Sequence, residues 1–95
     1  MAKFTRTFTS GDKKVSVANE EVKFTINRRG KDYNYTVTYL AFETFGTAIK
    51  FKINGEDTIH WVDADSKIVF SDIEIDMITI ITSGAEYYYT AFSEQ

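Results

Sequence analysis

The sequence predicts an all-β domain, an antiparallel β-sandwich of jelly-roll-like or immunoglobulin-like type with eight or nine short strands. Apolar and polar residues alternate with a period of two along almost the whole chain. The alternating stretches are rich in β-branched and aromatic residues, and turn-forming residues separate them about every 8–12 residues. No window keeps the spacing of an amphipathic helix. Because 95 residues fit one domain, we expect a single sandwich over residues 1–95.

The first half of the chain alternates in four stretches, with polar turns between them. Residues 10–12 (Ser-Gly-Asp) follow the first stretch, and residues 28–31 (Arg-Arg-Gly-Lys) follow the third. In the fourth, an aromatic or apolar residue recurs at every second position from Tyr33 to Tyr39, which predicts one strand with these side chains on one face. The strands predicted for this half are 4–9, 15–17, 22–26 and 33–42.

The second half repeats the alternation and adds a clear hairpin signal. Asn54-Gly55 between two alternating stretches is typical of a tight hairpin turn. Ser71-Asp72 is predicted to interrupt the sheet briefly. After Met77 the apolar residues change phase, which predicts a bulge near Asp76-Met77 or a strand buried on both faces. The strands predicted for this half are 49–53, 58–62, 67–70, 73–80 and 87–92.

Charge is divided unevenly along the chain. Residues 1–31 contain eight basic and three acidic side chains, a balance of +5, and Lys3 is one of the eight. Residues 32–95 contain three basic and eleven acidic side chains, a balance of −8, and the two parts sum to the net charge of −3. Such polarity in a small domain favours head-to-tail self-association or docking on an oppositely charged surface.

Several classes of protein are disfavoured by composition. The chain has no cysteine, so it has no disulfide framework, thiolate nucleophile or cysteine-based metal site, and a reducing cytosol is the expected place of synthesis. The N-terminus lacks the apolar run of a signal peptide. The longest apolar stretch, near Met77 to Ile81, is too short to span a bilayer, so we expect no membrane association.

The sequence contains no pattern typical of an enzyme. Its single histidine, His60, alternates with Ile59 and Trp61 and is interpreted as a structural or surface histidine on the opposite face from them. No serine lies in a nucleophile-elbow pattern. Glu74 and Asp76 have the residue types of a glycosidase pair, but their alternation with isoleucines favours the solvated face of a strand. We therefore expect no enzymatic activity, no catalytic residue and no cofactor.

A calcium site is also disfavoured. Read as a twelve-residue loop, the segment from Asp63 to Glu74 has acids at positions 1, 3 and 12, as an EF-hand requires. However, Lys67 takes position 5, where an oxygen ligand is needed, and Ile68 takes position 6, where glycine makes the sharp turn. The flanking segments are predicted strands rather than helices. We expect no bound metal.

Basic turns and aromatic residues are the predicted partner-binding elements. Arginine, tyrosine and tryptophan dominate the energetics of protein interfaces, and the basic side chains fall in turns between strands. The residues assigned to partner binding are Lys13, Lys14, Arg28, Arg29, Lys31, Trp61 and Tyr88.

Two other ligands fit parts of this set. Trp61 and the tyrosines 87–89 could form a carbohydrate- or receptor-binding surface, because aromatic rings stack on sugar faces, with a glycan as the ligand. The basic turns near Phe4, Phe8, Tyr33 and Tyr35 could bind single-stranded nucleic acid on an OB-like barrel. The acidic second half would repel phosphates, which disfavours nucleic acid.

The second half of the chain resembles small β-rich modules of tailed-phage virions. The stretches IKFKINGEDTIH (49–60), FSDIEIDMITI (70–80) and GAEYYYTAF (84–92) are similar to the strand, polar hairpin and final aromatic strand of capsid decoration, head-fibre and tail proteins. The resemblance implies a non-enzymatic structural protein of the virion, made in the host cytoplasm and present in many copies. Its implied partners are neighbouring capsid or tail subunits or copies of itself, in a decoration, stabilisation or attachment role.

Overall fold

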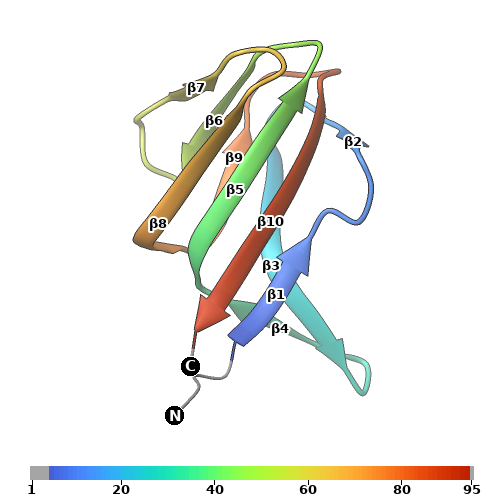
Figure 1. The fold of residues 1–95 in the computed structure, drawn as a ribbon. Helices are drawn as coiled ribbons and strands as arrows, with labels where there is room; N and C mark the ends of the chain where they lie inside the picture. The colour runs from blue at the N-terminus through green and yellow to red at the C-terminus, as the bar shows by residue number, and fades with distance from the viewer. Residues whose placement is uncertain (1–4, 95) are drawn as a thin grey trace.

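The computed structural model describes residues 5–94, which form ten strands and no helix, in two packed antiparallel sheets (Figure 1). The predicted β-sandwich is confirmed, with ten strands rather than eight or nine. Lys3 and Phe4, which were used in the predictions above, lie outside the described residues. No helix within residues 5–94 is long and apolar enough to cross a membrane. The strands are β1 (Thr5–Thr9), β2 (Lys14–Val15), β3 (Glu20–Arg28), β4 (Lys31–Tyr35), β5 (Val37–Phe45), β6 (Ile49–Ile53), β7 (His60–Val62), β8 (Lys67–Ile75), β9 (Met77–Ile80) and β10 (Glu86–Glu94).

The strand order is that of a jelly roll. One sheet has the order β1-β10-β5-β8, with β2 also paired to β10, and the other has the order β4-β3-β9-β6-β7. Four strand pairs are nested as in one long hairpin: β1–β10, β3–β9, β5–β8 and β6–β7. Two further pairs, β10–β5 and β9–β6, join different parts of this hairpin side by side, as happens when it is rolled into a jelly roll. This order decides between the two predicted sandwich types. It also differs from the five-stranded OB-like barrel on which the nucleic-acid alternative was based.

Two of the predicted strands are each divided at a corner between the sheets. The predicted strand 33–42 is β4 and β5, with Thr36 between them, and the predicted strand 73–80 is the end of β8 and β9, with Asp76 between them. The chain changes sheet at both corners, which explains the change of phase after Met77. Thr36 Oγ1 donates a hydrogen bond to Asp76 Oδ1, so the two corners are joined.

The bulge near Asp76-Met77 was therefore predicted at the wrong place. The irregularity lies within β8, where Val37 pairs with Ile75 but Tyr39 pairs with Ser71, so that β8 contains two extra residues. Asp72 in this bulge has a φ of 57°, a left-handed conformation that Asp and Asn adopt more readily than most residues. The predicted break at Ser71-Asp72 is this bulge, and β8 continues through it.

Asn54 holds the β8–β9 corner in place. Asn54 and Gly55 both have positive φ, and Glu56 N donates to Ile53 O at 3.0 Å, which closes the predicted tight turn. The Asn54 side chain donates to Glu74 O at 3.0 Å and accepts from the backbone N of Asp76 at 2.6 Å. Pairing with β7 begins only at Phe51 and His60, so the connection is longer than a two-residue hairpin loop.

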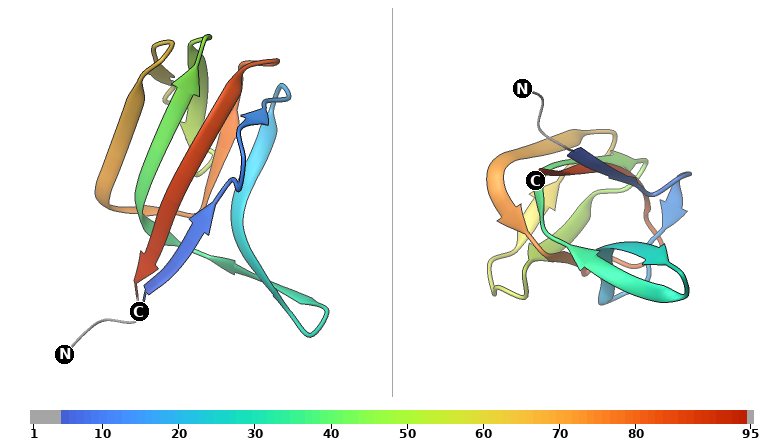
Figure 2. Two further views of the ribbon diagram at one scale, coloured as in Figure 1. Left: turned by 45° about the vertical axis from the view of Figure 1, so that its right-hand side comes forward. Right: turned by 90° about the horizontal axis from the view of Figure 1, so that it is seen from below.

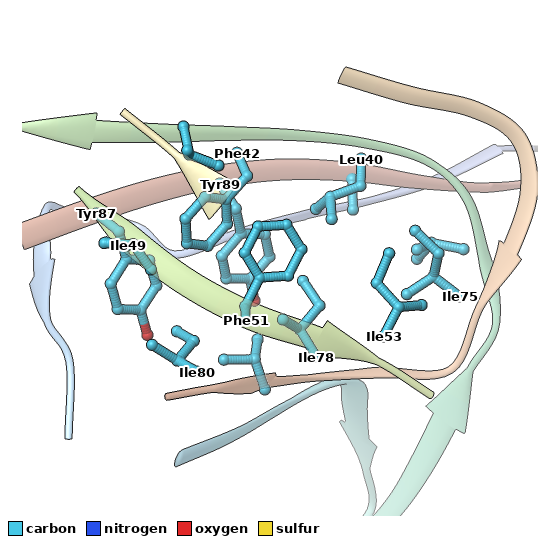
Figure 3. Packing of buried hydrophobic residues seen from close by; sticks show 14 of the residues in the cluster. Leu40, Phe42, Ile49, Phe51, Ile53, Ile75, Ile78, Ile80, Tyr87 and Tyr89 are labelled. Atoms are coloured by element: carbon cyan, nitrogen blue, oxygen red, sulfur yellow. The ribbon is translucent and has the colours of Figure 1, made fainter. Parts of the chain in front are cut away.

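The core between the sheets is built around stacked aromatic rings (Figure 3). Phe42 stacks on Tyr87 with ring centroids 5.4 Å apart and contacts Phe51 at 5.2 Å. Phe51 stacks in turn on His60 at 5.3 Å, and Phe70 of β8 meets His60 edge-on at 5.5 Å. His60 thus faces the core, on the side of β7 predicted from its alternation with Trp61.

Candidate protein-binding surfaces

The charge difference between the two parts of the sequence becomes a difference between the two lateral edges of the sandwich. On one edge, Phe8 of β1 lies against Phe24 of β3 at 5.8 Å, so β1 covers the β3–β4 side of the other sheet. On the opposite edge, Phe70 of β8 lies against His60 of β7. Residues 5–35 on the first edge contain seven basic and four acidic side chains, a balance of +3. Residues 54–76 on the second contain one lysine and seven acidic side chains, a balance of −6.

The β3–β4 hairpin projects beyond the sandwich as a two-stranded arm, residues 25–34 (Figure 2). Beyond Lys23, which pairs with Met77, β4 is the only described strand that pairs with β3. Every residue from 27 to 34 is exposed. Cross-strand hydrogen bonds nevertheless hold the arm in shape: Asn27 Nδ2 donates to Asp32 Oδ1 at 2.7 Å and Thr25 Oγ1 donates to Asn34 Oδ1 at 2.6 Å.

The tip of the arm is a tight basic turn. Arg28 pairs with Lys31, and the two residues between them, Arg29 and Gly30, have φ of 52° and 80°. Positive φ at both central positions defines a type I′ turn, whose twist matches that of the flanking strands. The Lys31 ammonium lies 5.5 Å from the centre of the Tyr33 ring. Three cationic side chains therefore project from a turn with a defined backbone.

The two predicted basic turns do not form one surface. Lys13 and Lys14 lie at β2, at the opposite end of the same edge from the arm tip (Figures 1 and 2). The Lys13 ammonium lies 4.3 Å from the ring centre of Phe45. The two turns are therefore available to separate contacts, and the arm carries the larger group of cations.

Trp61 and Tyr88 lie on opposite outer faces of the sandwich. Trp61 is 56% exposed on β7, where its Nε1 donates to Asp63 Oδ1 at 2.7 Å and the Lys50 ammonium lies 4.9 Å from the ring. Tyr88 is half-buried on β10, across from Glu43 of β5. Its neighbours 87 and 89 point into the core. The predicted surface of Trp61 with the tyrosine run is therefore not formed, and Trp61 remains as a separate exposed ring.

The aromatic residues invoked for nucleic-acid binding are also separated. Phe8 is buried against Phe24, and Tyr35 packs at the edge of the core beneath the Arg6 guanidinium, 4.7 Å away. Tyr33, 41% exposed, is left as the ring beside the basic tip that could stack on a base.

A further surface, not predicted from the sequence, lies on the outer side of β5 and β8. We define the β5–β8 face by Tyr39, Val69, Ile73 and the bulge residues Asp72 and Glu74. Val69 is 48% and Ile73 is 38% exposed, and the Tyr39 ring lies 5.1 Å from that of Phe92. A shallow hollow of about 390 Å³ opens at the bulge, lined by Thr38, Tyr39, Ser71, Asp72, Ile73 and Glu74.

Sequence reasoning missed this face for two reasons. Tyr39 was placed on the same face as Tyr33 and Tyr35, although the corner at Thr36 moves it to the other sheet. The apolar residues at consecutive positions 68–70 were the available signal, because they show that β8 carries apolar side chains on both faces.

The segment considered for a calcium site has a different structure from an EF-hand loop. Most of the segment tested for calcium, from Asp63 to Glu74, is strand β8 rather than a loop. Within residues 5–94, no group of three or more histidine, aspartate or glutamate side chains is placed to hold a metal ion. The chain matches no protein-family model, no curated protein and no solved structure. Functional interpretation therefore rests on the fold, the arm and the two outer faces.

Proposed function

We propose that this chain is a non-enzymatic structural protein of a phage virion, present in many copies, that binds neighbouring capsid or tail subunits through its basic arm. The arm is the observation that carries the proposal. An isolated two-stranded hairpin is marginally stable in water, and residues 27–34 are exposed on both faces. A second protein seated against the arm would cover it and pair its cations.

The arrangement of the rest of the molecule supports an oriented contact. The jelly roll supplies a rigid support, and the net charges of its two lateral edges have opposite sign. Oppositely charged edges steer the encounter and fix its direction. Jelly rolls serve in viral capsids and in lectins alike, so the fold is compatible with the proposal without deciding it.

Reversing the arm charges is expected to release the protein from particles. In phage particles produced from the genome that encodes the chain, Arg28→Glu with Arg29→Glu should abolish incorporation, because two cations at the contact become anions. The fold should be unaffected, since both side chains are exposed. Copy number per particle is measured by quantitative mass spectrometry, and the fold by circular dichroism.

The comparison variant is Lys13→Glu with Lys14→Glu, which makes the same charge change at the other basic turn that the sequence assigned to partner binding. Because the proposal places the contact on the arm, this variant should keep the wild-type copy number, and a loss equal to that of the arm variant would contradict the arm as the contact. Equal copy numbers for the wild type and the arm variant would contradict the proposal. If wild-type protein instead binds a glycan array and Trp61→Ala abolishes that binding, the carbohydrate-binding alternative takes its place, supported by the exposed and oriented Trp61 ring.

A further inference from the structure

We infer that the partner of the arm is a second copy of this chain, whose β5–β8 face receives it. The inference rests on the proposed function, because it names the partner of the same arm. Each copy would then use its arm as the inserted element and its β5–β8 face as the receptor.

The arm and the β5–β8 face cannot meet within one chain. The arm continues the β3–β4 edge, which lies under β1, whereas β8 forms the opposite edge of the first sheet and lies over β6 and β7. Figures 1 and 2 show the arm extending away from the side that carries β8. Any contact between the two surfaces is therefore between different molecules.

The two surfaces have complementary charge. The exposed part of the arm, residues 27–34, contains Arg28, Arg29 and Lys31 against Asp32, a balance of +2. The hollow of the β5–β8 face contains Asp72 and Glu74 and no basic residue, a balance of −2. Both carboxylate side chains are exposed. Within the described residues, neither has a side-chain hydrogen bond or salt bridge to the rest of the chain.

The chemistry of the hollow fits arginine in particular. A guanidinium pairs with a carboxylate through two parallel hydrogen bonds and also stacks on an aromatic ring. Asp72 and Glu74 supply the carboxylates, and Tyr39 supplies a ring in the same hollow. Ile73 and Val69 provide exposed apolar surface beside them, against which the arginine stems and the Tyr33 ring of the arm can pack.

A contact between two different surfaces has a structural consequence. It is heterologous, so each bound copy still presents one free arm and one free face. Such contacts continue into a closed ring or an open filament rather than stopping at a dimer. This property suits a protein that is present in many copies.

Two neutral variants test the inference by complementation. The arm variant is Arg28→Gln with Arg29→Asn, and the face variant is Asp72→Asn with Glu74→Gln. Asn is chosen at positions 29 and 72 because both have positive φ. By sedimentation velocity at low ionic strength, wild-type protein should form species larger than a dimer that dissociate as salt is added. Each variant alone should be monomeric.

The equimolar mixture of the two variants should form a 1:1 dimer and nothing larger. One partner then contributes the intact arm and the other the intact face. The arm and the face that stay free in this dimer are both the substituted ones, so no further copy can bind. Recovery of this dimer also shows that both variants are folded. The matched control, Glu56→Gln with Asp57→Asn, removes two acidic charges from the β6–β7 loop and should assemble like the wild type.

Other outcomes would overturn the inference. These are a monomeric wild type, variants that self-associate alone, or a mixture without a dimer. If the arm variant is lost from particles while the face variant is incorporated normally, the arm binds a different virion protein. In that case the inference fails and the proposed function stands, whereas normal incorporation of both variants would contradict both.

Discussion

Replacing Phe51 by alanine is expected to lower the free energy of unfolding by about 4 kcal/mol, the largest effect of any single substitution considered. Phe51 is fully buried at the centre of the core, where its ring contacts those of Phe42, His60 and Phe70. It therefore joins the two sheets through its contacts with Phe42 and Phe70, while His60 is its neighbour within its own sheet. Small domains have total stabilities of roughly 5–15 kcal/mol, so the variant should be close to unfolding at room temperature.

Urea unfolding followed by Trp61 fluorescence measures this change. Phe51→Leu is the control, because it keeps most of the apolar volume and should lose about 1.5 kcal/mol or less. A loss below about 1 kcal/mol for Phe51→Ala would show that the aromatic stack does not hold the sheets together as described.

The second large effect is a loss of stability at alkaline pH that depends on Tyr87. The pKa of the Tyr87 hydroxyl is raised from 10 to about 12, mostly by burial and in addition by the nearby Glu20 carboxylate, which also accepts its hydrogen bond. Below pH 10 the hydroxyl is neutral in both the folded and the unfolded chain. Between pH 10 and about 12 the unfolded chain loses this proton first, which favours unfolding by about 3 kcal/mol in total.

Tyr87→Phe isolates this contribution. At pH 8 the variant should be less stable than the wild type by about 1 kcal/mol, because the hydrogen bond to Glu20 is lost. As pH rises from 10 to 12, the wild type should lose stability faster than the variant, so that the difference in unfolding free energy closes and reverses. A difference that stays constant over this range would contradict the assigned pKa shift.

The strands could be predicted from the sequence because alternation is a local property. The predicted stretch 49–53 coincides with β6, and the aromatic stretch 87–92 lies within β10. The corners could not be located in the same way. At Thr36 the alternation of aromatic residues continues while the chain changes sheet, so a period of two does not reveal to which sheet a residue belongs.

The candidate surfaces depend on long-range strand order, which the sequence does not show directly. The charge division was visible from composition, and the Arg28–Lys31 turn was recognised. Their spatial separation follows from pairings such as β1 with β10 and β5 with β8, between residues far apart in the chain. The sequence does not indicate that the arm projects from the sandwich, because Tyr33 and Tyr35 continue the alternation of a packed strand. In the structure, Tyr33 is exposed.

The most direct test of the contact proposed here is a photo-crosslink from the arm in assembled particles. Because the chain has no cysteine, Lys31→Cys gives a single attachment point for the crosslinker at the arm tip, and Lys14→Cys gives the matched control. The arm position should crosslink to a neighbouring virion subunit, and to residues 69–74 of a second copy if the copies bind head to tail, while the control gives little product. Crosslinks from the control position but none from the arm would contradict the central claim that the arm makes the contact.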